Sequence, residues 1–162
     1  MVGFIKVNCD AALTVDLSKG GLGVIFRDHI GAVVKAGSIP QKLGSVIQGE
    51  IMAIRSAFIY ALELSFDYLI VESDSRDAIA FCDGSKSPRW EVEDLVADVV
   101  RLKSSFSSIS FSFIPRVMNG IPDALARKAL SIGCIANWPN SIQWLQELCV
   151  TEATDCTHPS HQ

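Results

Sequence analysis

Three β-like runs near the amino terminus constrain the fold of this chain more than any other feature. They span residues 4–11, 22–27 and 32–39. The pair Gly20-Gly21 separates the first two runs, and Asp28-His29-Ile30-Gly31 separates the second from the third. Short turns rich in glycine and aspartate typically join antiparallel neighbours. The sequence therefore predicts two consecutive hairpins that build a three-stranded antiparallel meander.

A long helix is predicted to begin near Ser45. The segment Ser45-Val46-Ile47-Gln48 has the capping-box pattern, in which a hydroxyl and a glutamine side chain satisfy unpaired amides at a helix start. Apolar residues then recur at helical spacing, and they indicate one buried face: Ile47, Ile51, Ile54, Phe58 and Leu62.

The second half of the chain alternates between strand-like and helix-like segments. The predicted order is a buried strand over 68–73, a short helix over 78–81, a helix over 88–102 with Trp90 on its apolar side, a half-buried strand over 108–114, a helix over 121–132 and an amphipathic helix over 138–150. This order predicts an α/β fold. Its mixed five-stranded sheet would hold antiparallel strands 1–3 and then parallel strands added through helical crossovers, with helices flanking the sheet.

Composition fits one folded domain. Hydrophobic residues make up 49% of the 162 residues and charged residues 20%. We expect the domain to span 4–150 and to be followed by a polar, disordered tail over 151–162.

No apolar run approaches the roughly 20 residues that a membrane span needs. The five cysteines are odd in number and form no close pair, which favours a reducing, intracellular compartment, either cytoplasmic or nuclear. The net charge of −4 weighs against tight nonspecific binding of nucleic acid.

Four acidic residues stand where the local patterns leave least reason for them. Asp10 interrupts the first β-like run, Glu50 borders the apolar face of the long helix, Asp74 follows the buried strand, and Asp123 follows Pro122 at a helix start. If these elements converge, the carboxylates form an oxygen-rich pocket suited to hard divalent cations.

Three of these acids also have simpler interpretations. Glu50 could be a flanking glutamate that reaches water, since an unpaired buried carboxylate is costly. Asp74 could cap the helix that follows it. Asp123 could lie in a first helical turn because the helix dipole favours an anion there. Periodicity alone leaves these alternatives open.

Four segments of the chain resemble ribonuclease H, and most closely the plant reverse-transcriptase-like branch found in retroelements and in genes derived from them. Each segment carries one of the four acids in the order that the family has them. The segments are KVNCDAA at 6–12, GEIMAIR at 49–55, VESDS at 71–75 and IPRVMNGIPDALA at 114–126.

The resemblance implies a metal-dependent endoribonuclease that cuts the RNA strand of RNA–DNA hybrids. Asp10, Glu50, Asp74 and Asp123 would hold two Mg²⁺ ions, with Mn²⁺ as a substitute, against the scissile phosphate. Substrate contacts are expected from Asn8, Ala11, Ser75, Arg116 and Asn119, with further cationic help from Arg127. We expect a monomer that could also be part of a larger retroelement polyprotein.

Three departures from the family pattern favour a slower enzyme. Phe113 stands where strongly active members carry a histidine that handles protons. Ala11 replaces a glycine that approaches the RNA 2′-hydroxyl. The basic protrusion that grips the hybrid in some members is not apparent near 90–102, so binding should be weak and salt-dependent.

Two other functions remain open from the sequence. The domain could be a retroelement remnant that acts as a nucleic-acid or protein interaction module. It could also be another nuclease of the ribonuclease H-like superfamily, such as a 3′ exonuclease or a transposase-like enzyme. The glutamate on the first long helix and the Asn119-to-Asp123 spacing favour ribonuclease H over these relatives.

Overall fold

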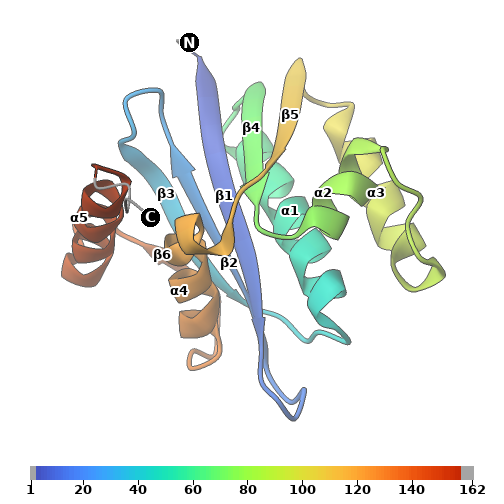
Figure 1. Cartoon of the computed structure of the whole chain (residues 1–162), viewed down its shortest axis with the longest axis horizontal. Coiled ribbons are helices and arrows are strands. Elements are labelled where there is room, and N and C mark those ends of the chain that lie inside the picture. Colours follow the sequence, from blue (N-terminus) through green and yellow to red (C-terminus); the bar gives the residue numbers. More distant parts are fainter. Residues whose placement is uncertain (1–2, 158–162) are drawn as a thin grey trace, which may run out of the picture.

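A single mixed β-sheet organises the molecule. The computed structural model describes residues 3–157, and side chains up to residue 154. The strands are β1 (Phe4–Leu13), β2 (Gly20–Arg27), β3 (Val33–Pro40), β4 (Tyr68–Ser73), β5 (Ser108–Phe113) and β6 (Ala136–Trp138), and they lie in the order β5-β4-β1-β2-β3-β6 (Figure 1). The predicted meander is confirmed, because β1 pairs antiparallel with β2 and β2 with β3. The predicted parallel additions are confirmed as well, because β4 pairs parallel with β1 and β5 with β4.

The sheet has six strands, so the predicted number of five is wrong. The extra strand β6 pairs antiparallel with β3 through Ala36↔Trp138 to Ser38↔Ala136. Of its three residues only Trp138 falls in the segment predicted as an amphipathic helix, and the other two lie in the connection before it. Three residues are too short for an alternating pattern to be visible in the sequence, and the free edge of β3 supplies the hydrogen bonds that fix them as a strand.

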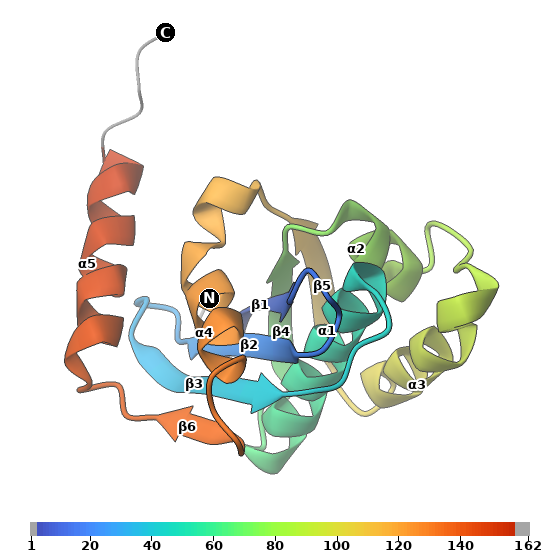
Figure 2. The same cartoon turned by 90° about the horizontal axis from the view of Figure 1, so that it is seen from below.

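Helices cover both faces of the sheet. They are α1 (Val46–Glu63), α2 (Arg76–Asp83), α3 (Glu93–Lys103), α4 (Gly120–Ala129) and α5 (Gln143–Thr157). Figure 2 shows α1, α2 and α3 on one face, and α4 with α5 on the other. The α1 face buries the larger apolar core, which includes Ile51, Ile54 and Phe58 from the predicted stripe. A smaller core joins α4, α5 and the sheet through Leu125 and Leu145.

The start of α1 is close to the predicted capping box. The Ser45 hydroxyl accepts a hydrogen bond from the Gln48 amide at 3.2 Å. The Gln48 side chain accepts one from the Gly44 amide at 2.5 Å, one residue before the cap itself. Two amides at the helix start are thereby satisfied, which fixes where α1 begins and which face it presents.

Two further helix predictions need correction. Trp90 lies in a 3₁₀ turn (Trp90–Val92) ahead of α3 and is 82% exposed, while Val92, Val96 and Val99 form the buried side. The expected boundary at residue 150 falls inside α5, which continues to Thr157, and the remaining tail residues 158–162 lie outside the described part of the chain. Within that described part, every helix is too short or too polar to cross a bilayer.

Candidate active site

Three acids meet at the edge of the sheet where β1 continues past β4. The last β1–β4 pair is Asn8↔Glu72, so Asp10 lies just beyond the paired stretch. Asp74 directly follows β4. Because β1 and β4 are parallel, their carboxyl ends reach the same edge, where open α/β sheets place their ligand sites. The strand pairing therefore brings Asp10 and Asp74 together from positions 64 residues apart in the sequence.

Glu50 reaches the same point from α1. A Cβ atom added at the neighbouring Gly49 would lie 2.8 Å from the Ala11 Cβ, closer than real side chains approach. The helix and β1 can therefore pack closely only because residue 49 is glycine. That approach places Glu50 beside Asp10, and the two residues are 5% and 3% exposed. The interpretation of Glu50 as a glutamate that reaches water is wrong.

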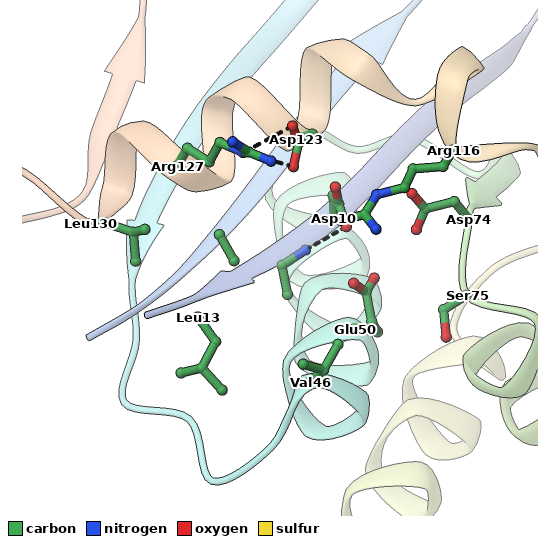
Figure 3. A pocket seen from close by; sticks show the side chains of 12 residues that line it. Asp10, Leu13, Val46, Glu50, Asp74, Ser75, Arg116, Asp123, Arg127 and Leu130 are labelled. Atoms are coloured by element: carbon green, nitrogen blue, oxygen red, sulfur yellow. Dashed lines mark hydrogen bonds and ion pairs between the residues drawn. The ribbon is translucent and has the colours of Figure 1, made fainter. Parts of the chain in front are cut away.

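The oxygens of these three acids form a compact cluster. One carboxylate oxygen from each of Asp10, Glu50 and Asp74 lies within 4.8 Å of the other two. Figure 3 shows the three side chains pointing toward one another at the centre of a groove. The alternative role of Asp74 as a helix cap is excluded, because the cap of α2 is Ser75, whose hydroxyl accepts from the Ala78 amide at 3.2 Å.

Burial and mutual repulsion make the cluster difficult to ionise fully. Burial and then the charge of Asp10 raise the pKa of Glu50 to about 10. Burial, with an added contribution from the charge of Asp74, raises the pKa of Asp10 to about 6. Burial also raises the pKa of Asp74, against the lowering effect of the nearby Arg116. Without a cation, the cluster retains at least one proton at neutral pH.

These properties fit a divalent cation. The Oε2 atom of Glu50 is buried and has no hydrogen-bond partner in the protein. A buried carboxylate oxygen without a partner is costly unless a proton or a metal ion neutralises it. Hard oxygen ligands from three acids are the donor set that Mg²⁺ and Mn²⁺ prefer. Asp10, Glu50 and Asp74 are thus the residues that would hold such an ion.

Asp123 lies at the rim of the site. Its side chain is 27% exposed, and Oδ2 is 3.0 Å from Nε of Arg127, one turn along α4. Its charge contributes to raising the pKa of both Asp10 and Asp74, so it is close to the cluster. Figure 3 shows Asp123 turned toward Arg127, with Arg116 reaching between Asp10 and Asp74. The rim therefore presents one further acid and two cations.

The groove that contains the cluster is open and polar. It encloses about 550 Å³ and is lined by all four acids. Three of the residues expected to contact substrate, Ala11, Ser75 and Arg116, also line it. The Ala11 amide donates to Oδ1 of Asp10 at 2.9 Å, and this hydrogen bond orients the carboxylate.

The two asparagines of the predicted site do not line this groove. Asn119 is fully buried, and its side-chain amide donates to the Cys9 carbonyl at 3.0 Å. It therefore joins the start of α4 to β1. Asn8 is 4% exposed and donates to the Glu72 carboxylate at 3.1 Å. Direct substrate contact by either asparagine is not supported by this burial.

Phe113 is covered by a cation. The Arg76 guanidinium lies 3.9 Å from the centre of the Phe113 ring. Such stacking adds favourable electrostatic energy between the cation and the face of the ring. A phenyl ring cannot exchange protons, so this position contributes packing and holds Arg76 beside Ser75.

Glycines that position Asp123 were missed as functional residues. Added Cβ atoms at Gly21 and Gly23 of β2 would lie 2.3 Å from the Ala126 carbonyl and 2.2 Å from the Pro122 carbonyl. Helix α4 therefore rests directly on the backbone of β2. The signal was present in the sequence, because glycines two apart in a strand face the same side and mark a close approach by another backbone.

Comparisons with known proteins place most of the chain in one family. Residues 8–129 match the family described as reverse transcriptase-like. A comparison with curated protein sequences gives no significant match.

Several solved structures share the fold. Ribonuclease H1 from the halophilic archaeon Halobacterium salinarum is 22% identical, with a TM-score of 0.76 over 80% of this chain and 98% of that chain. LC11 ribonuclease H1, isolated from compost and solved in complex with an RNA/DNA hybrid, is 19% identical, with a TM-score of 0.72 over 78% and 96%. The prototype foamy virus protease–reverse transcriptase is 15% identical, with a TM-score of 0.58 over 80% of this chain and 21% of the viral chain. The chain therefore belongs to the reverse transcriptase-like family and has the ribonuclease H fold.

Proposed function

We propose that this protein is a divalent-metal-dependent endoribonuclease that hydrolyses the RNA strand of RNA–DNA hybrids. The observation that carries the proposal is the convergence of the Asp10, Glu50 and Asp74 oxygens within 4.8 Å at the centre of an open groove. Family membership and the hybrid bound to one structural relative support the choice of substrate. A bound RNA–DNA hybrid would place one phosphate of its RNA strand over the acids.

The four acids would hold two Mg²⁺ ions, or Mn²⁺ in their place. When bound, the metal supplies activation of the attacking water and stabilisation of the leaving 3′ oxygen. Asp10 and Glu50 would provide buried ligands, Asp74 a half-buried one and Asp123 a ligand at the rim. Because the cluster holds a proton when it is metal-free, metal binding must release protons and should strengthen as pH rises.

The other residues of the groove would position the substrate. Arg116 reaches between Asp10 and Asp74, where its guanidinium can pair with a phosphate oxygen. The Ala11 amide holds one oxygen of Asp10 in place. Phe113 provides no proton acceptor or donor, so water must carry protons between the site and the solvent. We therefore expect slow turnover.

A labelled RNA–DNA hybrid at low salt, with Mg²⁺ or Mn²⁺, tests this function. Wild-type protein should cut the RNA strand only when the metal is present. Asp10→Asn removes one buried ligand at constant volume and should reduce cleavage by at least 100-fold while the protein stays folded. Asp94→Asn is the matched control, since Asp94 is exposed on α3, outside the groove. Full activity of Asp10→Asn would show that the site is wrong.

A second candidate is an interaction module that binds hybrid or protein without cutting. Phe113 favours it, because the position can no longer take part in proton transfer. The two functions differ in their response to metal. A working site should be stabilised by millimolar Mg²⁺, since ligand binding to the folded state raises stability with occupancy. A folded protein that binds hybrid, shows no Mg²⁺-dependent shift in Tm and cuts nothing would be such a module.

A further inference from the structure

A second groove lies next to the acidic groove and continues it past the end of α4. It encloses about 650 Å³ between the β1–β2 hairpin, the β3–α1 connection and the segment that follows α4. Leu130 lines both grooves. Figure 3 shows Leu130 at the opposite end of α4 from Asp123, so the acids and the second groove lie at the two ends of this helix.

The charge of the second groove is opposite to that of the first. Lys19 and Lys42 line it, and no acid does. Both lysines are exposed, and within the described part of the chain neither forms an ion pair or a cation–π contact. Asp16 lies on the same hairpin, but its carboxylate accepts hydrogen bonds from Thr14 and Ser18 and does not line the groove. Two unpaired ammonium groups therefore face solvent here in a chain whose net charge is −4.

The backbone beneath the lysines is firmly held. The Gln41 amide donates to the Gly20 carbonyl at 3.0 Å, which ties the β3–α1 connection to the start of β2. A Cβ atom at Gly20 would lie 2.3 Å from the Gln41 carbonyl. The two segments that carry Lys19 and Lys42 therefore touch through their main chains. Fixed backbones lower the entropy lost when side chains bind a ligand.

The length of α4 gives the distance from the acids to the second groove, which can be expressed in nucleotides. Ala129, the last residue of α4, lies six positions after Asp123, so the helix covers about 9 Å between them at 1.5 Å per residue. One strand of a duplex carries a phosphate for about every 3.4 Å of axis. The second groove thus begins roughly three nucleotides from the acids.

We propose that the second groove binds the phosphodiester backbone of the RNA strand about three or more nucleotides from the cleaved bond, with Lys19 and Lys42 as phosphate contacts. The inference rests on the proposed nuclease function and adds a binding track to it. The RNA strand is the occupant because the groove continues the one in which the scissile phosphate of that strand would lie. Phosphate contacts of this kind position the strand without reading its bases.

The test measures hybrid affinity for Lys19→Ala/Lys42→Ala in an Asp10→Asn background, which keeps the RNA intact. One substrate is a short hybrid. The others are the same hybrid extended at one end by six single-stranded nucleotides, either on the RNA strand or on the DNA strand. We expect the double variant to weaken binding about tenfold for one RNA-extended hybrid and to leave the short hybrid unchanged. The slope of log K against log salt should fall in magnitude by roughly 1.4, since the extension is single-stranded and each lost phosphate contact there removes about 0.7.

Two matched variants complete the design. Lys6→Ala/Lys35→Ala removes the same charge outside both grooves and should weaken all substrates alike. Lys19→Arg/Lys42→Arg retains the charge and should restore the affinity. Two results would overturn the inference while the protein with intact acids still cleaves hybrid. In the first, Lys19→Ala/Lys42→Ala weakens the binding of all substrates alike, as the charge-matched control does. In the second, the alanine variant weakens the binding of DNA-extended hybrids only. If the protein neither cuts nor binds any hybrid, the nuclease assignment is overturned together with this inference.

Discussion

The buried proton of Glu50 should make the metal-free protein lose stability as pH rises. The pKa of Glu50 is raised from 4.5 to about 10 in the folded state, mainly by burial and then by the charge of Asp10. Between these values the folded protein keeps a proton that the unfolded chain has lost. Stability is therefore fully present below pH 4.5 and falls as pH rises toward 10.

The magnitude follows from the number of protons involved. One extra proton in the folded state lowers the free energy of unfolding by about 1.4 kcal/mol for each pH unit. Between pH 6 and pH 8 the loss should be about 2.7 kcal/mol, or roughly 5–10 °C in Tm for a chain of this size. Glu50→Gln carries no titrating group and should remove most of this slope, because its neutral amide is already uncharged in both states.

Urea unfolding in EDTA at several pH values measures this slope directly. Glu63→Gln, exposed at the end of the same helix, serves as the matched control and should keep the wild-type slope. Saturating Mg²⁺ should raise the stability of wild-type protein at pH 8 by about 2.7 kcal/mol at 100 times its Kd, and should do less for Glu50→Gln. A flat wild-type profile from pH 6 to pH 8 would refute the buried-carboxyl argument.

Two further substitutions test other parts of the structure. Gly23→Ala would place a Cβ atom 2.2 Å from the Pro122 carbonyl, so we expect a loss of about 2–4 kcal/mol in urea unfolding and reduced cleavage, whereas Gly133→Ala, with open space around it, should do neither. Phe113→His introduces an ionisable group at the position where strongly active members of the resembling family carry a histidine, and it should raise the cleavage rate severalfold near pH 7 with a new pH dependence; an unchanged pH–rate profile would show that this position does not handle protons.

Much of the fold could be predicted because local patterns agree with the tertiary structure. The meander, the capped α1 helix and the buried strand β4 each have a strong local signal in spacing, turns or caps. The elements that differ from the sequence-based prediction have weak local signals. The strand β6 exists because β3 offers a free edge, and Trp90 is exposed because the chain turns before α3 begins. Neither cause is visible in a short stretch of sequence.

The roles of individual polar residues depended on burial and contacts. Asp74 and Ser75 are neighbours, and either could cap a helix from sequence alone, but only Ser75 does. Asn119 had the pattern of a substrate contact, yet the packing of α4 against β1 buries it completely. Hydrogen-bonding groups of one type can serve structure or substrate, and only their surroundings decide between the two.

The sequence by itself determined the candidate site residues: an ordered set of four acids on elements whose type and order follow from hydrophobic spacing. Only the tertiary structure decided how they divide, with Asp10, Glu50 and Asp74 sharing one compact cluster and Asp123 held at the rim by Arg127. The reason is physical. Spacing along a chain fixes which face a residue occupies, whereas distances between acids, and hence their pKa values and affinity for metal, depend on how closely glycine positions let helices approach the sheet.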